Sequence, residues 1–264
     1  MATSMLNVRE IALDEGLAIH ACVQGATRLN VVDQTLLERA RVEFEALLAR
    51  AEVRCVLLSG VDEHAFIGGA NLHALAALNA ATAEPFIRAI HDFCAALRRA
   101  PVPVIAVMRG HCLGAGLEIA AACDIRIGDP SVRCGMPEVR VGVPSVIEAA
   151  LLPGLIGWGR TRELLLRGHI IDAAEAHAIG LLQHVVAPDA LDTLALTIAN
   201  DIAAAAPGAI AAQKRLCLQW EDSGSSAAIE HGVQSFVAAY RDGDEARRYI
   251  ARFFAGRKPP AEPR

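Results

Sequence analysis

The sequence lacks the features that mark several common protein classes. Its seven cysteines include no Cys-x-x-Cys pair, so we expect reduced thiols in a cytoplasmic protein rather than a disulfide framework or a zinc site. Its 25 Lys and Arg residues form no cluster except the short segment around Arg257, and the net charge of -5 argues against nucleic acid as a partner. No apolar run approaches the roughly 18 residues that span a bilayer, so no membrane association is expected.

Motifs for nucleotide cofactors and for a serine nucleophile are also missing. There is no Gly-x-Ser-x-Gly and no Gly-Lys-Ser/Thr, and Ile119 stands where a dinucleotide fingerprint needs its third glycine. The histidines show no metal-ligand spacing, so neither a cofactor nor a metal is indicated. Residues 1–7 carry no basic stretch before an apolar core, and no signal peptide is expected.

The stretch that organises the chain runs from residue 102 to residue 124. Residues 102–108 are an apolar run that predicts a buried strand, and the glycine-punctuated turn after it leads into an alanine-rich segment suited to a buried helix. The first N–H groups of a helix have no partner within it, and the helix dipole favours negative charge there. Glu118 lies about one turn inside the predicted helix. Backbone donors for an oxyanion and a carboxylate for proton transfer therefore share one short segment.

The remaining pattern alternates strand and helix in the first half and is almost entirely helical in the second. Residues 8–13 and 17–23 predict a hairpin, and residues 53–58 predict a further strand. Thr82, with Pro85 in the first turn, is expected to open a helix. With 264 residues and 53% hydrophobic composition, the chain can bury a sizeable core, and the alternation predicts an α/β fold.

Three motifs carry a family resemblance. They are Gly68-Gly69-Ala70-Asn71, Gly114-Ala115-Gly116-Leu117-Glu118 and Met136-Pro137-Glu138, and their residues, order and separation resemble those of the crotonase (enoyl-CoA hydratase/isomerase) superfamily. The resemblance implies an α/β crotonase (ClpP-like) fold, in which a spiral of ββα units forms two roughly perpendicular sheets. It assigns residues 1–200 to the catalytic core and residues 201–264 to a helical oligomerisation region. A homotrimer or a hexamer of two stacked trimers is expected.

The same resemblance implies a site for acyl-CoA thioesters, with CoA as part of the substrate and no separate cofactor. By position, the peptide N–H groups of Ala70 and Ala115 form an oxyanion hole for the thioester oxygen, and losing one such donor costs about 3–4 kcal/mol of barrier. Glutamates at both catalytic positions are typical of hydratases. Glu118 is then expected to deprotonate the attacking water and Glu138 to protonate Cα, so that the predicted activity is enoyl-CoA hydration.

Further residues are assigned to CoA by resemblance. The carbonyl of Gly68 and the backbone of Leu72 are expected at the adenine end of CoA. Arg28 is expected near the CoA phosphates, with a solvated surface arginine as an equal alternative. Lys258 is expected to reach the CoA of a neighbouring subunit. His111, beside the glycine turn, is interpreted as a packing residue because no carboxylate or nucleophile partner is apparent nearby.

Several alternatives stay open at this stage. Isomerases of the family can work with a single glutamate, so Δ3-Δ2 isomerisation, thioester hydrolysis and decarboxylation compete with hydration, as does a catalytically inert CoA-binding protein. The sequence also departs from the family at two places. Asn71 replaces a common aspartate but keeps a helix cap. Residues 142–148 are bulkier than the usual glycine-rich turn and add Glu148, which could redirect the chemistry, bind a polar acyl group or face solvent.

Overall fold

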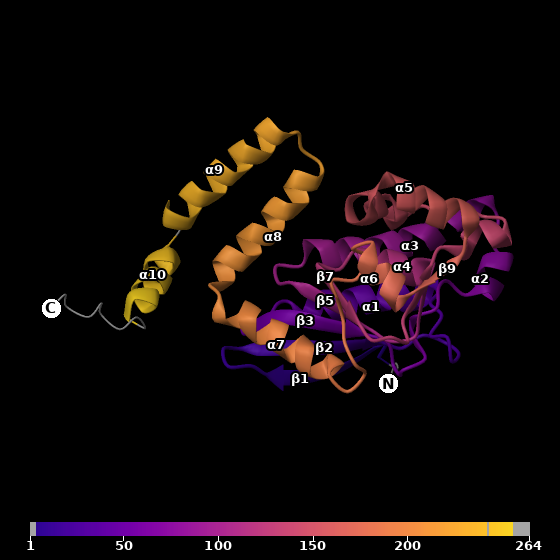
Figure 1. Cartoon of the computed structure of the whole chain (residues 1–264), viewed down its shortest axis with the longest axis horizontal. Coiled ribbons are helices and arrows are strands. Elements are labelled where there is room, and N and C mark those ends of the chain that lie inside the picture. Colours follow the sequence, from indigo (N-terminus) through magenta and orange to yellow (C-terminus); the bar gives the residue numbers. More distant parts are fainter. Residues whose placement is uncertain (1–3, 242, 256–264) are drawn as a thin grey trace.

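The protein contains two β-sheets, and strands of one sheet alternate along the chain with strands of the other. The computed structural model describes residues 4–241 and 243–255 (Figure 1). The larger sheet has the strand order β1-β2-β3-β5-β7-β10, in which β1 and β2 are antiparallel and every later neighbour is parallel. Its strands are β1 (Leu6–Ala12), β2 (Leu17–Val23), β3 (Val53–Ser59), β5 (Val104–Met108), β7 (Ile125–Gly128) and β10 (His184–Val185).

The second sheet has four strands of three residues each, in the order β4-β6-β8-β9. Each of β3, β5 and β7 in the large sheet is followed along the chain by a strand of the small sheet, so that successive strand pairs advance through both sheets together. This arrangement is the spiral of paired strands and helices that the family resemblance implied. The strands are β4 (Ala65–Ile67), β6 (His111–Leu113), β8 (Arg133–Gly135) and β9 (Ile170–Asp172).

The central strands of the large sheet, β3 and β5, are buried on both faces, whereas most residues of the edge strand β1 are exposed. Along β3, Val56 and Leu58 face the main core beneath the helices of the first half, whereas Cys55 and Leu57 face a second core under the helix Leu191–Ala204. Because successive side chains of a strand point to opposite faces, a strand covered on both sides reads as a continuous apolar run. The unbroken runs of β3 and β5 therefore follow from the position of these strands between two layers of helices.

Helix starts in the first half depend on short polar caps. The Asp33 side chain accepts from Leu36 N at the start of α1, and Asn71 caps α2 by accepting from His73 N. The prediction that Thr82 opens a helix was wrong, because Asn79 is the cap and Thr82 closes a capping box three residues later. The helices of this half are α1 (Gln34–Leu47), α2 (Leu72–Ala76), α3 (Ala80–Arg99) and α4 (Ala115–Ala121).

The second half contains short 3-10 turns followed by helices. Helix α5 changes direction at Gly157, whose φ of 73° lies outside the helical range. Asp172 caps α6 by accepting from Glu175 N at 2.9 Å. The elements are η1 (Pro137–Val141), η2 (Ile147–Leu151), α5 (Leu152–Arg167), α6 (Ala173–Ala178), α7 (Leu191–Ala204), α8 (Pro207–Glu221), α9 (Ser225–Arg241) and α10 (Glu245–Ala255).

A buried lysine attaches the C-terminal helices to the sheet-bearing part of the protein. Lys214 of α8 donates to Asp124 Oδ2 at 2.7 Å and to the carbonyl oxygens of Leu97 and Val102 at 2.9 and 3.0 Å. The Asp124 carboxylate also accepts a hydrogen bond from Val104 N, so Asp124 links the Lys214 ammonium to the central strand β5. A charge this deeply buried is stable only when it is fully paired. Beyond this anchor, α9 and α10 extend away from the sheets (Figure 1).

Among the residues that the structure describes, no single helix is long and apolar enough to cross a membrane. Only α7 and α8 taken together have the required length and composition, and they are bent by 107° at the break between them.

Candidate active site

Four of the residues predicted for catalysis line one cavity of about 340 Å³. They are Ala70, Ala115, Glu118 and Glu138, and they come from the β4–α2 turn, from α4 and from η1. Most of the remaining wall is apolar. It consists of Leu75, Leu78, Ala83, Phe86, Ile87 and Ile90 from α2, α3 and their connection, and of Val143, Pro144 and Val146, with Glu84 and Ser145 as the other polar members.

The two predicted oxyanion donors have their N–H groups free. Ala70 forms a β-bridge with Val32. In this bridge Val32 N donates to Gly69 O and Asn71 N donates to Val32 O, so the bridge hydrogen bonds involve the residues on either side of Ala70 and leave the Ala70 N–H unused. Ala115 is the first residue of α4, where a backbone N–H has no partner within the helix. Within the described residues neither N–H has a hydrogen-bond acceptor, and both residues border the cavity.

A close backbone approach brings these donors together. A Cβ atom at Gly116 would overlap the carbonyl oxygen of Ile67, so only glycine lets α4 pack against the end of β4. Residue 114, just before the helix, has a φ of 53°, which a side chain would rarely tolerate. The glycines of this motif therefore place the start of α4 beside the turn that holds Ala70.

Glu118 is almost fully buried, with 4% of its surface exposed. Its Oε1 accepts from Ala149 N at 3.2 Å. Burial raises the pKa of Glu118 to about 8, and the negative charges of Glu138 and Glu148 act in the same direction, whereas the Ala149 N–H opposes them. No cationic residue in the described part of the chain lines the cavity, so no positive charge there favours the ionised carboxylate.

Glu138 is half-buried opposite the first turn of α4. Ser145 Oγ donates to its Oε2 at 2.8 Å, and a Cβ at Gly114 would come within 2.6 Å of its Oε1. Burial raises the pKa of Glu138, and the hydrogen bond from Ser145 counteracts that rise. Ser145 was not predicted as a site residue, because its only signal in the sequence is its place in the unusual segment 142–148.

The middle residues of segment 142–148 line the cavity, but Glu148 does not. Its side chain is 7% exposed, and Oε1 pairs with His91 Nδ1 at 2.8 Å. Two of the three earlier interpretations of Glu148 are therefore wrong, since the carboxylate neither faces solvent nor reaches the acyl cavity. It lies behind Glu118, on the side of α3.

Of the residues predicted to bind CoA, Ala70 and Ala115 line the cavity, whereas Gly68, Leu72 and Arg28 do not. Gly68 follows β4 directly, and Leu72 is the first residue of α2 and is 59% exposed. Arg28 is exposed, and its guanidinium contacts His64 on the neighbouring loop. Lys258 lies outside the described residues. The structure thus brings the four catalytic positions together, while the CoA assignments stay predictions.

The other groups of interest in the sequence are packed away from the cavity. His111 lies in β6 with a buried Nδ1 that has no partner in the described part of the chain. Cys112, Cys123 and Cys134 are buried, as expected of small core residues. Among the residues described, no three His, Cys, Asp or Glu side chains come together in a way that could hold a metal ion.

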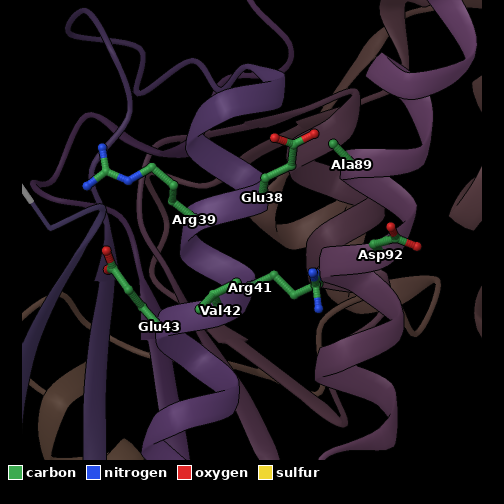
Figure 2. A pocket seen from close by; sticks show the side chains of 7 residues that line it. All are labelled: Glu38, Arg39, Arg41, Val42, Glu43, Ala89 and Asp92. Atoms are coloured by element: carbon green, nitrogen blue, oxygen red, sulfur yellow. The ribbon is translucent and has the colours of Figure 1, made fainter.

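A groove outside the site lies between α1 and α3 (Figure 2). It is lined by side chains of both signs, among them Glu38 and Arg41 on α1 and Asp92 on α3. Asp92 directly follows His91 on α3, while Phe86, Ile87 and Ile90 of the same helix line the catalytic cavity. Helix α3 therefore separates the two hollows.

Comparison with known proteins agrees with the fold and the motifs. Residues 23–262 match the family described as enoyl-CoA hydratase/isomerase. The short-chain-enoyl-CoA hydratase of Clostridium acetobutylicum is 32% identical over 210 residues, which cover 76% of this chain and 77% of that protein. The (E)-benzylidenesuccinyl-CoA hydratase of Thauera aromatica is 30% identical over 214 residues, which cover 80% of this chain and 81% of that protein.

Solved structures give the same result at the level of the fold. An enoyl-CoA hydratase from Bacillus anthracis superposes with a TM-score of 0.88 at 26% identity, covering 97% of this chain and 98% of that one. The spiral of paired strands and the glycine-bounded helix α4 define a protein of the crotonase class. The chain belongs to the enoyl-CoA hydratase/isomerase family.

Burial of Glu118 predicts a pH-dependent loss of stability. The folded protein holds the Glu118 proton up to about pH 8, whereas an unfolded glutamate loses its proton near 4.5, so stability falls as the pH rises between these values. Glu118→Gln removes this loss. We expect the variant to be more stable than wild type at pH 8 by on the order of 2–4 kcal/mol, and within about 1 kcal/mol of it at pH 5.

Urea unfolding at the two pH values and one protein concentration measures the effect. The exposed Glu163, which pairs with Arg160 and Arg167, provides the matched control. Glu163→Gln should stay close to wild type at both pH values. An equal gain for Glu118→Gln at pH 5 and pH 8 would contradict titration of Glu118 as the cause.

Proposed function

We propose that the protein is an enoyl-CoA hydratase, which adds water across the 2,3 double bond of a 2-enoyl-CoA thioester. The observation that supports this reaction is the presence of two carboxylates, Glu118 and Glu138, in one cavity with two free backbone donors. Hydration needs a base for water and an acid for Cα on one face of the alkene. Two neighbouring buried carboxylates bind protons with different affinities. One can therefore be ionised and act as the base while the other is protonated and acts as the acid.

In the proposed mechanism the thioester oxygen accepts hydrogen bonds from Ala70 N–H and Ala115 N–H. Water held between the two glutamates gives one proton to Glu118, and its oxygen bonds to Cβ. The π electrons of the double bond move toward the thioester and form an enolate, whose oxyanion the two N–H groups stabilise. Glu138 then protonates Cα. The proton left on Glu118 returns to Glu138 before the next turnover.

Burial of the pair sets one condition on this mechanism. In the substrate-free cavity Glu118, with a pKa of about 8, holds its proton more firmly than an ordinary glutamate at neutral pH. The proposed base must be ionised, so binding of water and substrate has to favour the proton on Glu138. Ser145 is positioned to follow that change, because its hydroxyl can donate to an ionised Glu138 or accept from a protonated one.

Loss of the conjugated thioester absorbance of crotonyl-CoA tests the reaction. Wild type should consume the absorbance, and Glu138→Gln should lower kcat by about 10²–10⁴-fold because Gln cannot donate the proton to Cα. Ser145→Ala, which removes only the hydrogen bond to Glu138, should fall between the two.

Other outcomes of this assay identify the competing reactions. Conjugated absorbance that appears with a 3-enoyl-CoA, and survives in Glu138→Gln, would assign an isomerase that uses one glutamate. Release of free CoA would assign a hydrolase. Binding of crotonyl-CoA without turnover of any of these substrates would contradict catalysis altogether.

The cavity wall supports an uncharged acyl group as the substrate. Leu75, Phe86, Ile87 and Val146 are apolar, and the ionisable side chains of the lining are all glutamates. A second carboxylate on the acyl group would meet apolar walls and negative charge, with no cation to pair with it. The relative from Thauera aromatica is named for an acyl group that carries such a carboxylate, so the two sites are expected to differ here.

We therefore expect 2-hexenoyl-CoA to be a better substrate than glutaconyl-CoA, which carries a terminal carboxylate, by at least about 10²-fold in kcat/KM. The measurement is steady-state kinetics on both thioesters, and CoA itself serves as a competitive inhibitor that controls for binding of the shared moiety. Equal kcat/KM values would contradict the proposed role of the apolar wall.

We also propose that the protein assembles as a homotrimer or as a hexamer of two trimers. Helix α9 carries an apolar stripe at helical spacing, and the structure leaves it exposed in the single chain. The stripe consists of Ile229, Val233, Phe236, Val237 and Tyr240.

Sedimentation at several protein concentrations tests this assembly. Phe236 is 67% exposed in the single chain, so Phe236→Asp should change little in an isolated subunit but should break an apolar interface and yield smaller species. Gln234→Asp introduces the same charge beside the polar residue Glu230 and should leave the mass unchanged. A monomeric wild type would rule the assembly out.

A further inference from the structure

Glu148 is a buried carboxylate that the proposed reaction does not use. Its Oε1 is paired with His91 Nδ1, while its Oε2 is buried without a hydrogen-bond partner in the described residues. A buried, half-satisfied carboxylate is costly and needs a compensating reason. Burial raises the pKa of Glu148, and the hydrogen bond and charge of His91 oppose that rise.

The backbone beside Glu148 is strained. Ile147 has a φ of 39°, a left-handed conformation that a β-branched residue rarely adopts. Such strain persists only where surrounding contacts impose it. The turn that carries it, η2, packs against both α3 and α4, and its residue Ala149 directs its N–H at Glu118 Oε1.

The turn therefore makes a hydrogen bond on each of its two sides, one to α3 and one to α4. On one side the Glu148 side chain is tied to α3 by His91, whose own side chain is 46% exposed. On the other side the adjoining peptide donates to Glu118 on α4. The hydrogen bond with His91 and the hydrogen bond from Ala149 N to Glu118 thus hold the strained turn from its two sides.

We propose that Glu148 and His91 form a positioning pair for Glu118, which holds the strained turn in place and sets a second buried negative charge behind the catalytic carboxylate. This inference rests on the proposed catalytic role of Glu118. The pair itself touches no substrate in this arrangement, since neither residue lines the cavity.

The charged and titratable groups around the pair are few. Glu118 faces Glu138 from η1, Glu148 from η2 and the thiol of Cys94 on α3. Glu148 faces His91, Cys94 and, at longer range, Arg98, all on α3. Burial also raises the pKa of Cys94, so this thiol stays neutral and adds no charge. Glu148 is therefore the one charge near Glu118, apart from its catalytic partner, that a single isosteric substitution can remove.

The test measures proton binding directly, so that it does not depend on turnover. Protein labelled with ¹³C at glutamate carboxyl groups is titrated by NMR, and the Glu118 signal is identified by its absence in Glu118→Gln. Glu148→Gln keeps the shape and a hydrogen-bond partner for His91 but removes the charge. We expect it to move the Glu118 midpoint to lower pH by at least about half a unit, because a like charge has been removed.

Three further variants complete the test. Glu148→Asp keeps the charge and should return the midpoint toward that of wild type. Asp92→Asn removes one negative charge from the next residue of α3, on the side of the groove in Figure 2, and should leave the midpoint unchanged. His91→Leu should raise the midpoint of Glu148 itself, because the carboxylate loses its hydrogen bond; this variant carries the test if Glu148→Gln does not fold.

The outcomes separate the positioning pair from the proposed reaction. A Glu118 midpoint that is unchanged in Glu148→Gln, or shifted equally in Asp92→Asn, would overturn the proposal. A shifted midpoint in a protein that turns over no enoyl-CoA would leave the pair standing and remove the hydratase function. With active enzyme, the limb of the kcat/KM profile that reports Glu118 should move to lower pH in Glu148→Gln, whereas a purely structural loss would lower kcat without moving it.

Discussion

Burial of two carboxylates in one cavity without a cation is the constraint on which the rest of the site depends. Glu118 and Glu138 are withdrawn from water and repel each other, so the pair resists carrying two charges. The compensation comes from dipoles: the peptide of Ala149 at one carboxylate, and the backbone of Glu138 with the hydroxyl of Ser145 at the other. The site is thereby suited to moving protons, because neither carboxylate is locked into one state by a permanent ion pair.

The fold makes this arrangement possible by bringing strand ends and helix starts together. Helix α4 approaches β4 so closely that residue 116 must be glycine, and the same approach sets Ala115 N–H near Ala70 N–H. Because both donors are backbone groups, their positions depend on packing rather than on side-chain identity. The carboxylates are then added from α4 and η1.

Some of this was predictable from the sequence, and the reasons for the rest are physical. The apolar runs of β3 and β5 and the glycine turn before Glu118 are local signals, and they located the strand, the turn and the helix. The second sheet has strands of only three residues, too short to show a period, and was expected only through the family resemblance. The place of Glu148 depends on a strained turn and on His91, 57 positions away in the chain, which no local pattern encodes.

The unusual segment 142–148 shows how one loop can act on both catalytic carboxylates. Ser145 donates to Glu138, which favours the ionised form of that group, while Glu148 stands behind Glu118 and disfavours ionisation there. The two effects have opposite sign, so in the substrate-free cavity the loop widens the difference between the proton affinities of the carboxylates, a difference that binding of water and substrate has to reverse for the proposed mechanism. A glycine-rich turn has no side chains with which to do this. The strain at Ile147 is therefore best understood as the cost of placing these two side chains on opposite sides of one short turn.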